Sequence, residues 1–204
     1  MNDESENPDT KKPTKYFLII AGVVLLVILI FLLFGFRREK PAANTVSYNY
    51  FTFEEVGGLW QTNIQLGGQL YEALFRFNPE QVQDVYVSGN FSGFRNQPVY
   101  ITFDPDSDDE QFKYLALAAS ELSLHLVRAL NVTIEAACTK NITDVCADRA
   151  IVTCADADKS VMYLVALSPT QITLGNSCVT LNGEGMELLK SVDRLLFQWY
   201  KIIQ

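Results

Sequence analysis

The feature that most constrains this chain is a run of 21 residues, 16–36, that contains no charged side chain. As an α-helix the run extends about 30 Å, which matches the hydrocarbon core of a bilayer. We therefore predict a transmembrane helix over residues 16–36. Residues 1–15 are polar and interrupted by proline, so we predict a disordered tail there.

Two kinds of targeting signal are alternatives to a retained anchor. A cleaved signal peptide has a shorter apolar region followed by small residues. Here the run meets the charged segment 37–40, and Ala42-Ala43 beyond it is a poor cleavage site. A pilin-type signal requires a small residue where this chain has Tyr16, and an amphipathic continuation that Pro41 opposes. We favour the retained anchor.

The charges that flank the run do not decide its orientation, because three basic residues lie on each side and the positive-inside rule gives a tie. The cysteines favour an oxidising compartment: there are four, Cys138, Cys146, Cys154 and Cys178. None forms a CxxC pair, and the single histidine is distant in sequence, which disfavours zinc. Of three possible disulfide connectivities we favour Cys138–Cys146 with Cys154–Cys178. The alternative is a cytosolic domain with four reduced, buried cysteines.

Three N-x-S/T sequons begin at Asn90, Asn131 and Asn141 and predict glycosylation outside the cytoplasm. Asn141 lies in a polar loop beside two cysteines, which suits an exposed acceptor. Asn131 follows a predicted helix, where a left-handed cap is the alternative explanation. Together with the cysteines, these sites predict a cytoplasmic N-terminus and an extracytoplasmic C-terminal domain.

Charge limits the partners of that domain. The chain carries a formal charge of −8, to which the tail contributes −1 and segment 37–40 contributes +2, leaving −9 for residues 41–204. Such a surface repels phosphate backbones and anionic lipid. We therefore expect no nucleic-acid partner, and contact with the lipid bilayer through the anchor alone.

The rest of the chain predicts one α+β domain, residues 47–204, after a juxtamembrane linker, 37–46. Between 47 and 77 hydrophobic residues alternate, and Gly-Gly pairs at 57–58 and 67–68 predict tight turns of a three-stranded antiparallel meander with aromatic residues in its core.

Strands at 99–103 and 132–138 flank a helical pattern at 108–130, which makes a parallel βαβ unit. Hairpins are predicted around 156–159 and 175–176. The C-terminal residues predict an amphipathic helix that continues to the chain end and packs on a mixed sheet.

The acidic segment before the predicted helix has two explanations. Asp104, Asp106 and Asp108 have the spacing that starts a calcium loop, but the glycine and the final glutamate of such a loop are missing. We favour a helix-capping box made by Ser107 and Glu110. Within the helix, Glu121 and His125 are an acid–base pair or, as we favour, part of a solvated polar stripe.

Several short motifs of the domain carry a resemblance: Gly57-Gly-x-Trp60-x-Thr62, Asn78-Pro79, Ala137-Cys-Thr-Lys-Asn141, Thr153-Cys-x-Asp-x-Asp158 and Asp193-Arg-Leu-Leu196. Together they resemble a group of archaeal single-pass membrane proteins of uncharacterised activity with an exported α/β domain. The similarity covers most of residues 45–203. It implies an envelope location, and no activity, cofactor or catalytic residue.

No nucleotide-binding, nucleophile-elbow or HExxH motif is present, so we expect no cofactor. Our first hypothesis is a membrane-anchored extracytoplasmic domain with a non-catalytic structural or partner-binding role at the cell envelope. The alternatives are a hydrolase that uses the carboxylates of Asp104, Asp156 and Asp158, and an accessory subunit of a membrane complex whose anchor packs through Ala21-Gly22.

Overall fold

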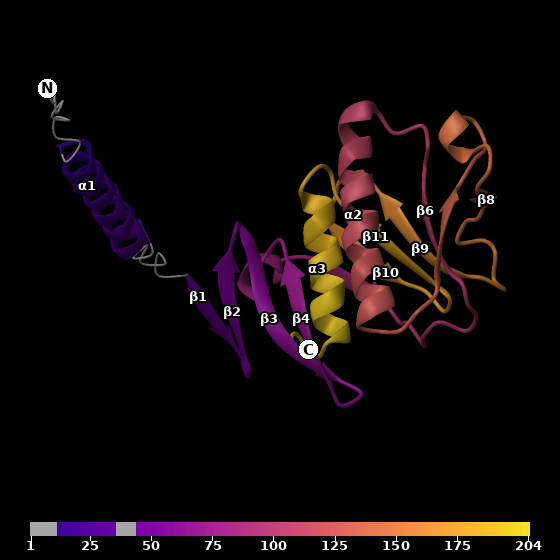
Figure 1. Cartoon of the computed structure of the whole chain (residues 1–204). Coiled ribbons are helices and arrows are strands. Elements are labelled where there is room, and N and C mark those ends of the chain that lie inside the picture. Colours follow the sequence, from indigo (N-terminus) through magenta and orange to yellow (C-terminus); the bar gives the residue numbers. More distant parts are fainter. Residues whose placement is uncertain (1–11, 36–43) are drawn as a thin grey trace, which may run out of the picture. The chain divides into compact units, whose positions relative to one another are not determined.

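A computed structural model describes residues 12–35 and 44–204. The chain divides into two compact units, Met1–Ala42 and Ala43–Gln204. The first contains helix α1 (Lys12–Gly35), shown in Figure 1. This helix begins at Lys12 and not at Tyr16, so residues 12–15 of the predicted tail are helical. The remainder of that tail, 1–11, lies outside the described residues.

The side chains of α1 are described over residues 16–32, where they are uncharged and, with one exception, exposed to the surroundings. Within the described ranges, the structure contains no helix whose length and apolar character together suffice to cross a membrane.

The second unit begins with an antiparallel meander, built from β1 (Thr45–Tyr48), β2 (Phe51–Val56), β3 (Leu59–Leu66) and β4 (Gln69–Phe75). Both glycine pairs have positive φ, as the predicted turns require. The meander has four strands and not three, because Asn49 adopts a φ of 53° and turns β1 back against β2. The last two residues of the predicted linker 37–46 therefore belong to β1, which begins at Thr45. Linker residues 37–43 lie outside the described residues.

The second sheet is mixed, with the order β5-β10-β11-β9-β6-β7-β8. Its strands are β5 (Tyr86–Gly89), β6 (Val99–Phe103), β7 (Ile134–Cys138), β8 (Ala150–Ile151), β9 (Ser160–Val165), β10 (Gln171–Leu174) and β11 (Cys178–Asn182). Helix α2 (Asp109–Arg128) links β6 to the parallel strand β7, which confirms the βαβ unit. The antiparallel pair β10–β11 confirms the hairpin around 175–176.

The predicted hairpin around 156–159 is wrong. Strand β8 pairs in parallel with β7 at the sheet edge, whereas β9 lies between β6 and β11. The segment between them crosses the sheet: the Thr102 hydroxyl of β6 donates to the Val152 carbonyl, and Cys154 is bonded to Cys178 of β11. The local turn at Asp156 forms as expected, since its carboxylate accepts the Thr153 N–H, but the chain leads to a different neighbour.

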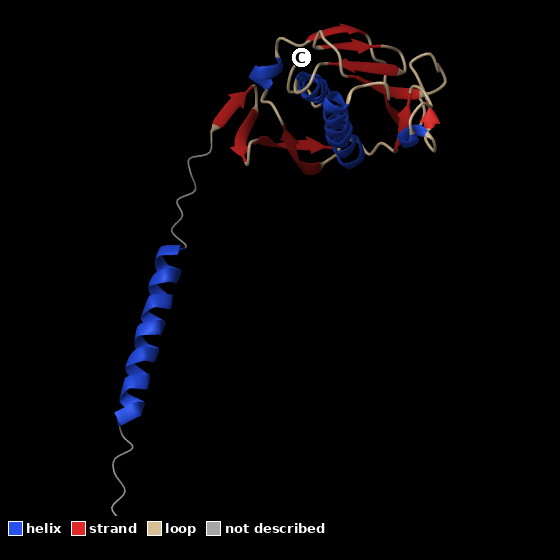
Figure 2. Ribbon diagram, turned by 90° about the horizontal axis from the view of Figure 1, so that it is seen from above, coloured by secondary structure: helices blue, strands red, loops and turns tan. Residues whose placement is uncertain are grey.

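Helices α2 and α3 (Glu187–Trp199) lie between the two sheets, as Figures 1 and 2 show. Their facing side chains form one buried core with the inner faces of both sheets. Phe197 of α3 lies 5.6 Å from Phe53 and 4.5 Å from Phe75 between ring centroids. The meander aromatics Phe53 and Phe75 are fully buried, as predicted.

The N-terminus of α2 and the C-terminus of α3 differ from the sequence predictions. Asp108 is the N-cap of α2, with its carboxylate accepting the Gln111 N–H at 2.7 Å. The predicted Ser107–Glu110 box is wrong because the Ser107 hydroxyl donates to the Asp104 carbonyl in the preceding turn. Helix α3 ends at Trp199, since Lys201 adopts a φ of 59° and turns the last residues back onto the helix.

Candidate functional site

His125, which the sequence places in a solvated polar stripe on α2, is buried. His125 is 4% exposed, and it lies between the Leu74 carbonyl of β4 and the Tyr200 hydroxyl, with Nε2 3.0 Å from the former and Nδ1 2.8 Å from the latter. Because a carbonyl only accepts, Nε2 carries the proton and Nδ1 accepts from the phenol. Burial lowers the pKa of His125 to about 4, so the imidazole is neutral at pH 7.

Glu121 does not pair with His125 but with Arg76, at the end of β4. Asp193 of α3 is 1% exposed, and its Oδ2 accepts the backbone N–H groups of Arg76 and Phe77 at 2.8 and 2.9 Å. Desolvation raises the pKa of Asp193 and that of Glu121. These groups connect the end of the meander to the two helices. The Glu121–His125 acid–base pair is therefore wrong, and the solvated stripe is wrong at these two residues, whereas Lys113 and Arg128 are exposed as predicted.

The three carboxylates of the hydrolase hypothesis do not share a pocket in the described part of the chain. Asp104 and Asp106 hold the Lys140 ammonium at 3.0 and 2.8 Å, which raises the pKa of that lysine. Asp156 accepts from its own turn, and those hydrogen bonds lower its pKa. Asp158 uses its backbone carbonyl to accept from Asn96. Among residues 12–35 and 44–204, no group of three or more His, Cys, Asp or Glu side chains is arranged to hold a metal ion.

The cysteines form the disulfides Cys138–Cys146 and Cys154–Cys178, the same two pairs that the sequence favours. Cys138 and Cys146 are fully buried, whereas Cys154 is exposed beside β11. Two disulfides are typical of an oxidising, extracellular environment.

All three sequon asparagines are exposed. Asn131 has a φ of 53°, which is the left-handed conformation that a helix end favours. Asn141 lies in the exposed loop between β7 and the short helix η2 (Asp144–Cys146). Asn90 directly follows β5.

A hollow lies next to Asn90. Strand β5 ends at Gly89, whose φ is 84° and where an added Cβ would lie 2.0 Å from the Leu174 carbonyl oxygen. Only glycine permits this approach. The Asn90 N–H then donates to the same carbonyl at 3.0 Å, which fixes the start of the loop that follows.

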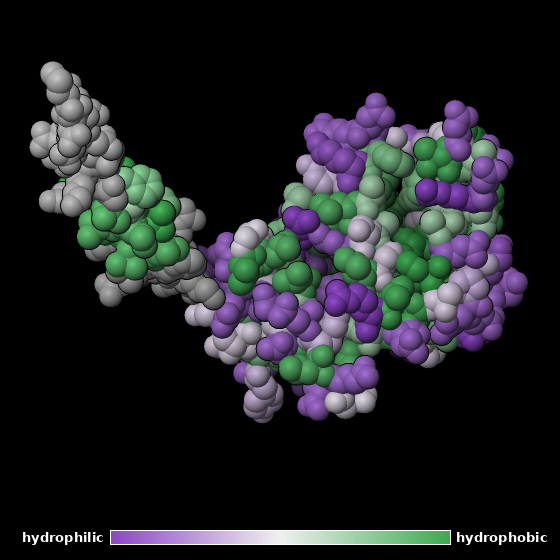
Figure 3. Space-filling model, viewed as in Figure 1, coloured by the Kyte–Doolittle hydropathy of each residue, from purple (hydrophilic) through white to green (hydrophobic). Residues whose placement is uncertain are grey.

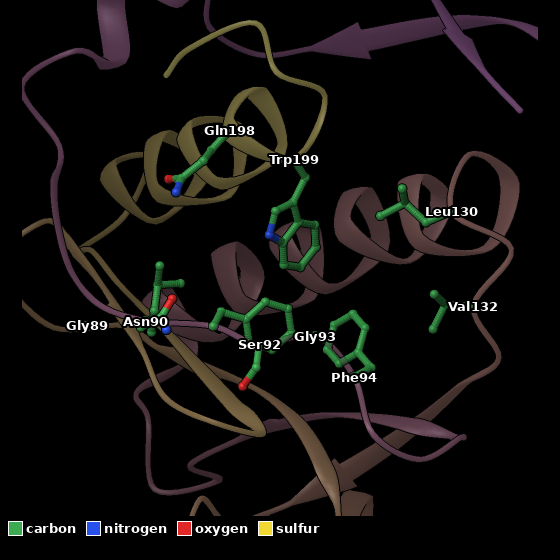
Figure 4. A pocket seen from close by; sticks show the side chains of 11 residues that line it. Gly89, Asn90, Ser92, Gly93, Phe94, Leu130, Val132, Gln198 and Trp199 are labelled. Carbon is green, nitrogen blue, oxygen red and sulfur yellow. The ribbon is translucent and has the colours of Figure 1, made fainter.

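Three rings on this loop and on α3 form the wall of the hollow. Phe91 stacks on Trp199 with 5.8 Å between centroids and 27° between planes, and the ring of Phe94 forms T-shaped pairs with both, at 73° to Phe91 and 81° to Trp199. We call the hollow the aromatic pocket; its volume is about 560 Å³, and it is lined by Gly89, Asn90, Phe91, Ser92, Gly93, Phe94, Leu130, Val132, Leu174, Gln198 and Trp199. Figure 4 shows Trp199 descending from α3 between Asn90 on one side and Leu130 and Val132 on the other.

The sequence shows a sequon at Asn90 but does not predict this pocket. One signal in the sequence could have indicated it: Phe91 and Phe94 lie in a segment rich in glycine and polar residues. Large aromatic side chains are usually buried, so two of them in such a segment indicate a contact with another part of the chain. Their partner, Trp199, is distant in sequence and is assigned to the core by its helical spacing alone.

No family model, curated protein or solved structure matches this chain.

Proposed function

We propose that this chain is a membrane-anchored extracytoplasmic module with a non-catalytic, partner-binding role, and that the aromatic pocket is its recognition site. The observation that carries the proposal is the lining of the pocket, which consists of aromatic, aliphatic, glycine, amide and hydroxyl groups and includes no acid or base. Such a hollow suits recognition of an apolar or amphipathic group and not proton transfer.

Three titratable groups outside the pocket have perturbed pKa values, and their contacts also support a non-catalytic role. Asp193 and His125 have their hydrogen-bonding atoms directed to neighbouring strands and helices. Glu121 is held by Arg76. Groups of this kind stabilise the contact between layers, and structural networks perturb pKa values as active sites do.

The anchor is proposed from the full uncharged run 16–36, which extends beyond the described side chains of α1. The continuous helix Lys12–Gly35 and the exposure of its described apolar side chains support it. A helix with a long run of exposed apolar side chains is unfavourable in water and favourable in lipid. A protein partner that is itself a membrane protein would make the chain an accessory subunit.

The extracytoplasmic location is proposed from the two disulfides and from three exposed sequons. Figure 3 shows hydrophilic residues around the periphery of one face of the second unit, with apolar residues between them, including some along and beside α2, where Leu124 is 51% exposed. The formal charge of −9 keeps such a surface apart from anionic lipid.

The location is tested with two variants of the full chain, each of which adds one free cysteine to the two disulfides: Ser120→Cys on the exposed face of α2 and Ser5→Cys in the tail. Intact cells are treated with a membrane-impermeant maleimide. We expect Ser120→Cys to be labelled and Ser5→Cys to be labelled only after lysis. The reverse pattern, or recovery of the chain in the aqueous fraction, contradicts the proposal.

The recognition site is tested with a photo-crosslinking amino acid placed at Gln198, on the pocket wall, and at Ser120 as the matched control. We expect a discrete adduct from position 198 that disappears when Trp199→Ala is added. Adducts that are the same from both positions, or that persist in Trp199→Ala, exclude the pocket as the recognition site.

A further inference from the structure

We infer that an N-linked glycan on Asn90 folds over the aromatic pocket and closes it. The inference rests on the proposed extracytoplasmic location and assigns a regulation to the proposed site: the chain without this glycan presents an open pocket, and the modified chain presents a closed one.

The geometry of the sequon supports this assignment. Asn90 is exposed and lines the pocket, and its N–H is held by the Leu174 carbonyl. The next residue of the sequon, Phe91, is itself one of the stacked rings. The side-chain nitrogen of Asn90 that would carry the sugar therefore lies at the pocket wall, as Figure 4 shows for the Asn90 side chain. The loop that contains Asn90 is hydrogen-bonded to β10 at Leu174.

The chemistry of the lining matches a saccharide. A sugar ring has a face of C–H groups and an edge of hydroxyl groups. Phe91 and Trp199 present apolar ring surface to such a face, and the side chains of Gln198 and Ser92 offer donors and acceptors to the edge. Because the glycan is covalently attached, docking does not incur the loss of translational freedom that a free ligand incurs.

The other two sequons provide the contrast. Asn131 lies between two residues that line the pocket but is not itself among the lining residues. Asn141 lies in an exposed loop, beside Ile142 with 54% of its surface exposed, and lines none of the described pockets that contain aromatic rings. A glycan at Asn141 is therefore a matched control that carries the same sugar without the aromatic pocket.

The test uses the full chain, produced in cells with an N-glycosylating secretory pathway and purified in detergent. The substitution Trp60→Phe leaves Trp199 as the only tryptophan, and Thr133→Ala removes the sequon at Asn131. Within this background, Thr143→Ala leaves Asn90 as the only sequon, Ser92→Ala leaves Asn141 as the only sequon, and the combined variant has none. Ser92→Ala keeps both Asn90 and Phe91.

The measurement is acrylamide quenching of Trp199 fluorescence, with glycan occupancy determined by mass spectrometry. We expect the quenching constant to fall by about twofold in the chain glycosylated at Asn90, because a ligand seated in a pocket covers most of the ring surface it contacts. The chain glycosylated at Asn141 should match the chain without sequons. Equal quenching with and without the Asn90 glycan overturns the inference, as does equal protection by the Asn141 glycan, or an unmodified Asn90 in a chain modified at Asn141.

The same variants separate this inference from the proposed function. If neither Asn90 nor Asn141 is modified, the extracytoplasmic location fails and the inference fails with it. If the Asn90 glycan protects Trp199 but the photo-probe at Gln198 gives no adduct in a chain that keeps Ser92 and is produced with N-glycosylation blocked, the pocket is not a partner site and the docking of the glycan still stands.

Discussion

The replacement His125→Gln tests how the meander is fastened to the helices. His125 is 4% exposed and bonds Leu74 and Tyr200, with Tyr71 and Phe75 packed against its ring. Glutamine keeps a donor that can reach the Leu74 carbonyl but does not titrate. We therefore expect it to remove the pH dependence that the imidazole gives to stability, and to leave the fold intact.

The sign and size follow from the pKa of His125, which burial lowers to about 4 from an ordinary value of 6.5. As pH falls below 6.5 the unfolded chain takes up the proton first, so the stability that this group contributes is present above pH 6.5 and is lost on the way down to pH 4. Between pH 7 and pH 5 the loss is about 2 kcal/mol, from about 1.4 kcal/mol per pH unit below pH 6.5.

Two neighbouring acids act in the opposite direction. The pKa values of Asp193 and Glu121 are raised by burial, so the stability that these two groups contribute falls as pH rises. Both acids are present in both proteins, and the charge of Arg128 beside His125 is common to both as well. The difference between wild type and His125→Gln at each pH therefore reports the imidazole.

The assay is urea unfolding of residues 44–204, which form a compact unit with their own core, at pH 7 and pH 5. We expect His125→Gln to cost about 1–3 kcal/mol at pH 7, because the Tyr200 hydroxyl loses its acceptor, and to cost about 2 kcal/mol less at pH 5. A cost that is equal at both pH values refutes the buried, neutral imidazole.

Three further predictions concern the rest of the second unit. Asp193→Ala leaves two partly buried N–H groups without their acceptor and should lower the free energy of unfolding by about 2–4 kcal/mol, with Asp193→Asn costing less than half of that; equal costs would contradict the role of the acceptor. Gly89→Ala should lower the free energy of unfolding by more than about 2 kcal/mol, because the added Cβ would clash with the Leu174 carbonyl oxygen. Gly93→Ala, where the Cβ would be in open space at a φ of 104°, should lower it by about 1 kcal/mol. Both are measured by urea unfolding, and a larger loss in Gly93→Ala is inconsistent with this geometry. Limited reduction followed by alkylation should label Cys154 and Cys178 before the fully buried pair; mass spectrometry of the labelled peptides decides the order, and earlier labelling of Cys138 would count against it.

Local patterns predicted the elements whose stability is local. The glycine pairs predicted two tight turns because positive φ is required there. The βαβ unit followed from the switch between strand and helix periods, and the β10–β11 hairpin from the glycine and asparagine between its strands. The N-cap was displaced by one residue because aspartate and serine compete for the same turn, and both sequence patterns fit.

The errors concern contacts between distant segments. The hairpin around 156–159 failed because a turn specifies a change of direction and not the strand that lies beyond it. The solvated stripe on α2 failed at two residues because polarity was taken as exposure: His125 and Glu121 face β4, where the Leu74 carbonyl and Arg76 bind them. The aromatic pocket was missed because its rings come from a loop and from the last helix.

The sequence alone was enough to predict an apolar helix ahead of an acidic α+β domain, the tight turns and the parallel unit, and to favour the two cysteine pairs that the structure contains. These follow from composition and from interactions between residues close in the chain. Only the tertiary structure decided which polar residues are buried and that Asn90 lies beside Trp199. Such choices depend on the surface that a distant segment covers, and no local pattern contains that information.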